Sequence, residues 1–316
     1  MAGLLEDSFD ARDHFYVPEL TVQCPRSVNL RQGDACLTSE IYDQLKTGSC
    51  TANATAAAFW YEEKAGRRGE IWGKAGPSRL FIYWLARGAY NHPSLNISWP
   101  SDSGCSVGDA MRGIAKCGVC REIDWPFDIT QINRRPPHEA FEKAKPHRIN
   151  SFYRLDPQRP YYNDVGLSTE EKDQIGAAVL ENLRQCLAER HPVVFEYRYF
   201  LPSHESFDES QTPFVLKDVW ALKDKKFPRH TFPENLPDEL RIRDKAGNFV
   251  TPGHTVLAIG YDDDKQAVLI QNSLGPEWGG KGTFWIPYSW ITNCGATYDF
   301  WTIRCTKPET LCIKKY

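Results

Sequence analysis

The sequence lacks several features, and each absence narrows the possible function. No apolar run approaches the roughly 20 residues that a membrane-spanning helix needs, so we expect no membrane partner. The N-terminus turns acidic at once and has no basic region followed by an apolar one, which argues against a secretory signal and favours a cytoplasmic location. Lys and Arg are scattered and the formal net charge is −3, which argues against a nucleic-acid partner.

The sequence also gives little support for a metal site built from histidines or for a zinc or redox site built from cysteines. The eight histidines are dispersed and show no metal-ligand spacing, so we expect no metal and no cofactor. Cys117 and Cys120 have the CxxC spacing, but no second pair at zinc-site spacing accompanies them. We interpret them as structural thiols, with a redox role as the alternative. Ten cysteines in a chain without a secretory signal favour reduced thiols over a disulfide framework.

The 316 residues are long for one core and short for two independent domains, which fits one enzyme of two lobes. Helical patterns dominate the first half, and strand patterns dominate the second half after one capped helix. The helices are expected at about 50–63, 78–88, 109–116 and 168–190, and the strands at 27–31, 149–155, 193–200, 255–261, 266–272, 282–287 and 298–304. This order predicts an α+β fold whose second half is mainly antiparallel.

The same patterns give the expected boundaries. We expect an extended arm over 1–27 and a catalytic domain over 28–316, with a helical lobe at about 37–148 and a β lobe at about 149–305. Residues 201–250 carry many charges and prolines with little periodicity, and we interpret them as an insertion between two strands. A loop of this length is uncommon in a compact domain and is often functional.

Cys50 is the first candidate for chemistry. The turn residues Thr47-Gly48-Ser49 lead directly into an alanine-rich helical segment, so Cys50 lies at or near a helix N-terminus. Unpaired N–H groups and the helix dipole favour a thiolate there, and the thiolate is the nucleophile. Gln44 lies six residues upstream and can supply an amide that holds an oxyanion together with the backbone N–H of Cys50. The alternative is a buried structural cysteine at the start of a core helix.

His254 and Asn272 are the second candidates. His254 enters an apolar strand, Asn272 ends the next one, and the turn at 262–265 lies between them. In an antiparallel hairpin these two positions can be cross-strand neighbours. An Asn oxygen can then orient the imidazole toward a thiol. A histidine of the core or the surface is the alternative.

These residues together resemble the papain-like cysteine peptidase family. The resemblance rests on Gln44 with Gly48-Ser49-Cys50, on Gly253-His254 before an apolar strand, and on the run from Asn272 to Gly279, in this chain order. It covers roughly residues 28–306 and implies a two-lobed fold, with a helical lobe, an antiparallel β-barrel-like lobe and the active site in the cleft between them.

The resemblance also implies roles for these residues. Cys50 matches the nucleophile, His254 the general base and acid, Asn272 the residue that orients the imidazole, and Gln44 the oxyanion-hole donor. The implied reaction is amide hydrolysis of a peptide or protein substrate through an acyl-thioester. A catalytically impaired binding protein of the same fold and a peptide ligase or transpeptidase are the alternatives, and the oligomeric state stays open.

Two further residues enter only through the resemblance. Gly108, in the run Gly104-Cys105-Ser106-Val107-Gly108, matches a glycine of the cleft wall that pairs with extended substrate. Trp278 matches an aromatic residue that lines the leaving-group side of the cleft.

The sequence also departs from the family pattern. Leu274 stands where a tryptophan usually covers the Asn–His hydrogen bond, and Thr51 replaces the aromatic residue after the nucleophile. His254 follows Cys50 by 204 residues instead of about 130–150, partly because of the insertion at 201–250. With only 27 residues before the first expected strand, no counterpart of the family's inhibitory pro-segment is expected, and we expect the insertion or the N-terminal arm to cover part of the cleft.

Overall fold

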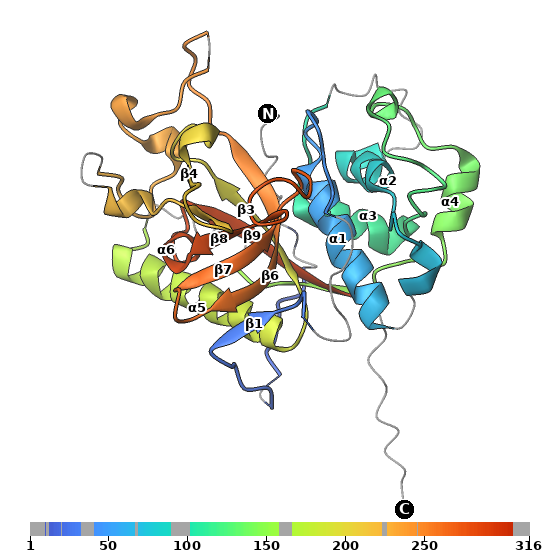
Figure 1. The fold of residues 1–316 in the computed structure, drawn as a ribbon, viewed down its shortest axis with the longest axis horizontal. Helices are drawn as coiled ribbons and strands as arrows, with labels where there is room; N and C mark the ends of the chain where they lie inside the picture. The colour runs from blue at the N-terminus through green and yellow to red at the C-terminus, as the bar shows by residue number, and fades with distance from the viewer. Residues whose placement is uncertain are drawn as a thin grey trace, which may run out of the picture.

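The computed structural model describes residues 10, 13–19, 21–32, 41–66, 69–89, 102–157, 166–222, 226–244 and 246–305. A helical lobe and a sheet lobe stand side by side, and α1 lies between them (Figure 1). This is the expected α+β, two-lobed architecture. Over the described ranges, no helix has the length and the apolar character needed to cross a membrane.

The helical lobe is built around the alanine-rich helix α1. Its helices are α1 Cys50–Ala65, α2 Arg79–Trp84, α3 Val107–Cys117 and α4 His138–Ala144. Small residues on every face of α1 allow close packing against α2 and α3 on one side and against β6, β3 and β9 on the other. Serine caps start its two neighbours, because Ser78 accepts from the N–H of Phe81 and Ser106 accepts from the N–H of Asp109.

The sheet lobe holds one long mixed sheet. Its strands are β1 Ser27–Asn29, β2 Ser151–Arg154, β3 Val193–Arg198, β4 Phe207–Asp208, β5 Phe214–Leu216, β6 Gly253–Asp262, β7 Ala267–Gln271, β8 Thr283–Pro287 and β9 Thr297–Arg304. Their order is β2-β9-β3-β6-β7-β8-β5-β4, and β1 pairs with β6. Helix α5 Thr169–Ala188 packs on the sheet, and α6 Tyr288–Ile291 follows β8.

The structure differs from the sequence prediction at the start of α3, at α4 and α6, and at the strands β4 and β5. Helix α4 lies between the expected helix at 109–116 and the expected strand at 149–155, where no helix was predicted. The insertion was expected to lack strands, but it contributes β4 and β5, and β5 pairs in parallel with β8, so the sheet is mixed and not purely antiparallel. Helix α3 starts at Val107, two residues before the expected start, because Ser106 is its N-cap.

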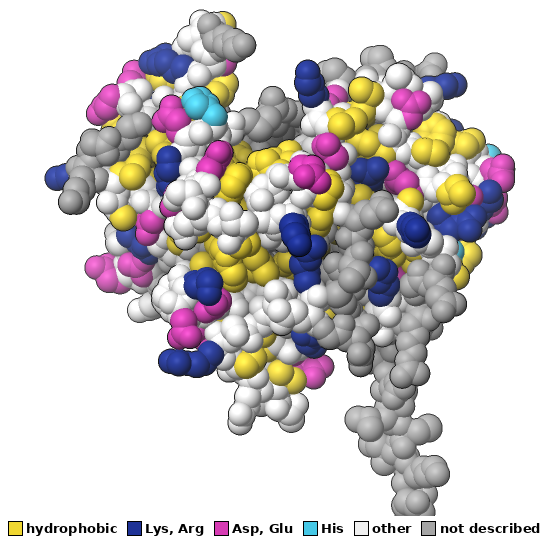
Figure 2. Space-filling view, in the orientation of Figure 1, with side chains coloured by type: hydrophobic (Ala, Val, Ile, Leu, Met, Phe, Trp, Pro, Cys, Tyr) yellow, Lys and Arg dark blue, Asp and Glu magenta, His cyan; other side chains and the backbone are white. Residues whose placement is uncertain are grey.

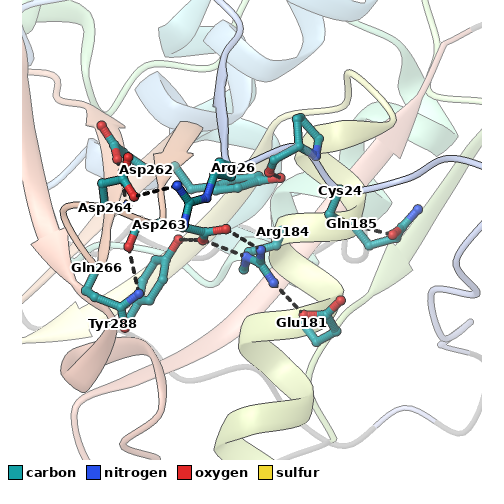
Figure 3. Close-up of polar contacts among 12 residues, drawn as sticks. Cys24, Arg26, Glu181, Arg184, Gln185, Asp262, Asp263, Asp264, Gln266 and Tyr288 are labelled. Atoms are coloured by element: carbon teal, nitrogen blue, oxygen red, sulfur yellow. Dashed lines mark hydrogen bonds and ion pairs between the residues drawn. The ribbon is translucent and has the colours of Figure 1, made fainter.

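A cluster of ion pairs fixes α5 against the turn between β6 and β7 (Figure 3). Arg184 contacts both carboxylate oxygens of Asp263, at 3.1 Å from Nε and 2.6 Å from Nη2. Its Nη1 also lies 2.8 Å from Glu181, and the hydroxyl of Tyr288 donates to Asp263 at 2.8 Å. Bidentate geometry and partial burial make this contact stronger than an ordinary surface pair.

We expect the Arg184→Ala variant to lower the free energy of unfolding by about 1–3 kcal/mol, because hydrogen bonds to charged groups contribute on that order. Urea unfolding measures the change. Arg26→Ala is the matched control, since Arg26 pairs with Asp264 at 3.6 Å while both side chains are largely exposed, and it should cause no measurable change. Equal midpoints for the two variants would contradict the expectation.

Candidate active site

The thiol of Cys50 lies at the first residue of α1. Ser49 is the N-cap but makes no side-chain capping hydrogen bond, and the first turn holds no acidic residue. No residue of the first turn therefore offsets the partial positive charge of the helix N-terminus beside the sulfur. The side chain of Cys50 is buried, with 7% exposure.

The turn before Cys50 is held by a carboxylate that the sequence did not reveal as important. The N–H of Gly48 lies 2.9 and 2.8 Å from the two carboxylate oxygens of Asp102, and the hydroxyl of Tyr83 donates to the same carboxylate at 2.5 Å. The hydroxyls of Thr47 and Ser49 lie 2.7 Å apart. Asp102 is 54 residues from Gly48, so no local pattern could have predicted this contact.

His254 and Asn272 meet as the hairpin argument predicted. His254 lies in β6, Asn272 directly follows β7, and Nε2 of His254 is 2.8 Å from Oδ1 of Asn272. The backbone N–H of Ser273 donates to the same oxygen at 2.8 Å, which fixes the orientation of the amide. An amide oxygen only accepts, so Nε2 carries the hydrogen and Nδ1 is left for the thiol.

A tyrosine on the neighbouring strand packs against the imidazole. Tyr197 of β3 is the cross-strand partner of His254, and the two rings lie 5.9 Å apart at 81°. Leu274, which stands where the family usually has a tryptophan, is 38% exposed. Tyr197 thus shields the imidazole from the β3 side, a role that sequence reasoning missed because it depends on strand register.

The electrostatics favour an ion pair between Cys50 and His254. Burial raises the pKa of the Cys50 thiol, but the hydrogen bond to His254, the charge of that ring and contacts with Thr255 outweigh it and lower the pKa to about 7. Burial lowers the pKa of His254, but the hydrogen bond to Cys50, the thiolate charge and Asn272 together raise it above its usual value. Each group therefore stabilises the charged form of the other.

Gln44 is tied to the segment that follows Asn272. Its Oε1 accepts from the hydroxyl of Ser273 at 2.6 Å, and its backbone N–H donates to the carbonyl of Ser273 at 2.8 Å. Its Nε2 donates to the carbonyl of Thr47 at 2.9 Å. An amide nitrogen has two hydrogens, so the second remains available to a substrate oxygen.

A cavity of about 510 Å³ adjoins Gln44 and His254. Trp278 forms part of its wall and packs edge-on against Phe207 with ring centroids 5.2 Å apart. The start of the insertion supplies Ser203, His204, Phe207 and Glu209 to the same wall. Figure 2 shows the molecule hollowed between its two lobes, with hydrophobic side chains along the hollow.

The sequence analysis expected either the insertion or the N-terminal arm to cover part of the cleft, and the lining of the cavity distinguishes these two segments. The first residues of the insertion border the cavity, whereas the described part of the N-terminal arm pairs with β2 near Arg154 and is absent from the lining. The insertion is also a folded part of the lobe, because Leu216, Val219 and Leu236 are buried. It therefore acts as a fixed wall in this structure.

The remaining sequence candidates are absent from the lining of this cavity. Gly108 is buried in the first turn of α3 and does not line the 510 Å³ cavity. Cys117 and Cys120 are free thiols, and burial raises the pKa of Cys120 to about 12, which makes it unreactive. Within the described ranges, no group of three or more His, Cys, Asp or Glu side chains is arranged to hold a metal ion.

Comparison with known proteins gives one curated relative and many structures. The chain is 31% identical over 267 residues to an uncharacterized peptidase C1-like protein of Acanthamoeba polyphaga mimivirus, across 84% of this chain and 70% of that protein. No protein-family model matches the chain.

Two solved structures illustrate the fold similarity. Xylellain, a cysteine protease from Xylella fastidiosa, is similar with a TM-score of 0.65 and 27% identity, over 97% of this chain and 96% of that one. Digestive procathepsin L2 proteinase from the larval midgut of Tenebrio molitor has a TM-score of 0.59 and 16% identity, over 96% and 77% of the two chains.

Proposed function

This chain belongs to the papain-like cysteine peptidases of the C1 type, and we propose that it cleaves peptide bonds through an acyl-thioester on Cys50. The observation that carries the proposal is the 2.8 Å contact between His254 and Asn272 together with the lowered pKa of the Cys50 thiol. A nucleophile, a base and an orienting group are thus available together, as nucleophilic catalysis requires.

In the first half of the proposed reaction, the Cys50 thiolate attacks the carbonyl carbon of the scissile bond. The carbonyl oxygen takes the negative charge and accepts hydrogen bonds from the backbone N–H of Cys50 and from Nε2 of Gln44. The His254 imidazolium then gives its proton to the leaving nitrogen, the C–N bond breaks, and the amine departs.

In the second half, neutral His254 takes a proton from a water molecule, and the resulting hydroxide attacks the thioester. The C–S bond breaks, the acid product leaves, and the proton held by His254 restores the ion pair. Asn272 keeps the imidazole in one orientation throughout, because its oxygen accepts from Nε2.

We further propose that Trp278 and the insertion residue Phe207 contact substrate on the leaving-group side. Both line the cavity beside Gln44 and His254. For Gly108, a backbone contact with extended substrate stays a proposal that rests on the family resemblance alone. The division into an arm at 1–27, a helical lobe at about 37–148 and a β lobe at about 149–305, and a cytoplasmic location, are likewise proposals.

The Gln44→Ala variant should lower kcat by about 10²–10³-fold, the effect typical of removing one oxyanion-hole donor. KM should change little, because the donor acts mainly after charge has moved onto the oxygen. Steady-state kinetics on a fluorogenic peptide measures both constants. Gln266→Ala, on the turn between β6 and β7, is the matched control; a loss confined to KM in the Gln44 variant would contradict the proposed role.

The general function is tested with a peptide library in water enriched in ¹⁸O. Hydrolysis places ¹⁸O in the new C-terminal carboxylate, whereas a ligase or transpeptidase joins the acyl group to a second peptide amine. The names of the relatives, peptidase and protease, favour hydrolysis over that alternative and over an impaired binding protein. Intact library peptides in the presence of correctly folded protein would contradict it.

A further inference from the structure

A hydroxyl group contacts the nucleophile in addition to the imidazole. Oγ1 of Thr255 lies 3.7 Å from Sγ of Cys50, within hydrogen-bonding range for sulfur. Thr255 follows His254 in β6 and is fully buried. It is therefore held in place by the strand and shielded from water.

The hydrogens around Thr255 can be assigned by counting donors. Oγ1 of Thr255 also lies 2.8 Å from Oγ1 of Thr51 and 3.3 Å from Oε1 of Glu196. Thr51 can give its hydrogen to Oγ1 of Thr255, which is nearer than the carbonyl of Cys105 at 3.0 Å, so Thr255 accepts in this contact and keeps its own hydrogen. Thr255 has one hydrogen to give, and a thiolate is the strongest of its acceptors because it is charged.

Glu196 completes this group from the neighbouring strand. It is the cross-strand partner of Thr255 in the β3–β6 pairing and is fully buried. Burial, and then the charges of Asp299 and Cys50, raise its pKa well above the usual value, which favours the protonated carboxyl. A protonated carboxyl can donate to Thr255, which frees the hydrogen of Thr255 for the sulfur.

We propose that Glu196 and Thr255 form a hydrogen-bonded chain to the nucleophile, in which the neutral Glu196 carboxyl donates to Thr255 and the Thr255 hydroxyl donates to the Cys50 thiolate. Thr255 stabilises the sulfur anion directly, and Glu196 is a positioning residue that acts through it. These hydrogen bonds transfer no net charge and no proton. It rests on the proposed function only in taking Cys50 as the nucleophile.

Titratable and charged groups from each neighbouring element face the hydrogen bonds between Glu196, Thr255 and Cys50. They are His254 from β6, Tyr197 and Arg198 from β3, Tyr298 and Asp299 from β9, and Cys105 before α3. Among them, Tyr298 hydrogen-bonds to Glu196, and the charge of Arg198 partly offsets that of Asp299. Burial nevertheless dominates for Glu196, because it is the largest influence on its pKa.

The test is the pH dependence of Cys50 alkylation by iodoacetamide, measured by mass spectrometry on the full chain. Thr255→Val keeps the shape and removes the donor, so the acid limb of the profile should move up by about one pH unit and the rate near pH 6 should fall about tenfold. Thr255→Ser keeps a hydroxyl and should restore the wild-type profile. Glu196→Gln keeps a neutral donor and should leave the acid limb in place.

Each result has a defined reading. Thr302→Val, which removes another buried hydroxyl from the sheet on β9, is the control for folding and should leave the profile unchanged. An unmoved acid limb in folded Thr255→Val overturns the proposal. A shift to lower pH in Glu196→Gln also overturns it, because that shift would mean an ionised Glu196 that opposes the thiolate. Alkylation needs no peptide turnover, so a failure of the proposed hydrolysis is seen separately in the ¹⁸O experiment.

Discussion

Replacing Cys50 by alanine should lower kcat/KM for peptide hydrolysis by at least about 10⁴-fold, the scale of losing the nucleophile in an enzyme with covalent catalysis. The physical reason is that no other thiol in the described part of the chain is activated in the same way. Cys105 is the nearby alternative, but burial raises the pKa of its thiol well above the usual value and persists in the variant, so this thiol stays protonated.

Activity and labelling should disappear together in this variant. A thiol-directed epoxide or iodoacetamide should modify Cys50 rapidly at neutral pH in the wild type and should fail to modify the Cys50→Ala protein at a comparable rate. Cys24→Ser is the matched control, since Cys24 is partly exposed, burial raises its pKa, and serine can keep its hydrogen bond to Gln185. Full peptidase activity in Cys50→Ala would end the proposed mechanism.

Replacing His254 by alanine should lower kcat/KM by at least about 10³-fold, because it removes the proton donor for the leaving amine and the base for deacylation. A second effect follows from the electrostatics. Burial alone raises the pKa of the Cys50 thiol, and His254 is the main influence that brings it down to about 7. Without the imidazole, the thiol pKa should rise, and the thiolate fraction at neutral pH should fall.

The direction of the pH dependence separates these two effects. Alkylation of Cys50 in His254→Ala should be slow near pH 7 and should recover only as the pH rises toward the range of a buried thiol. Activity should not recover in parallel, because the proton donor is still missing. His138→Ala is the control, since that side chain is 87% exposed. An alkylation profile identical to the wild type would show that His254 does not stabilise the thiolate.

The sequence predicted the elements that depend on local patterns. The helix from Cys50 and the capped helix from residue 168 follow from propensity and capping alone, and both are present, the second with a capping box of Ser168 and Glu171. The contact of His254 with Asn272 was also predictable, because a hairpin brings the start of one strand close to the end of the next.

The features that the sequence did not reveal depend on contacts between distant segments. The parallel pairing of β5 with β8 joins residues about 70 positions apart, and no local periodicity encodes it. Glu196 was recognised as part of a strand, but its burial beside Thr255 depends on the register of β3 against β6. Buried polar groups of this kind break the apolar pattern at a functional site, where sequence rules are expected to fail.

The link between residues 42–44 and residues 273–275 has a consequence for motion. The backbone bonds from Gln44 to Ser273 and from Gly275 to Tyr42, with the bridge of Asp43 and Leu274, join the two halves of the molecule beside the reacting groups. These backbone hydrogen bonds restrict the motion of one lobe relative to the other at this point. The side-chain amide of Gln44, which donates to the oxyanion, and that of Asn272, which orients the imidazole, therefore move together as one rigid unit. A substrate would then meet a catalytic geometry that is already assembled.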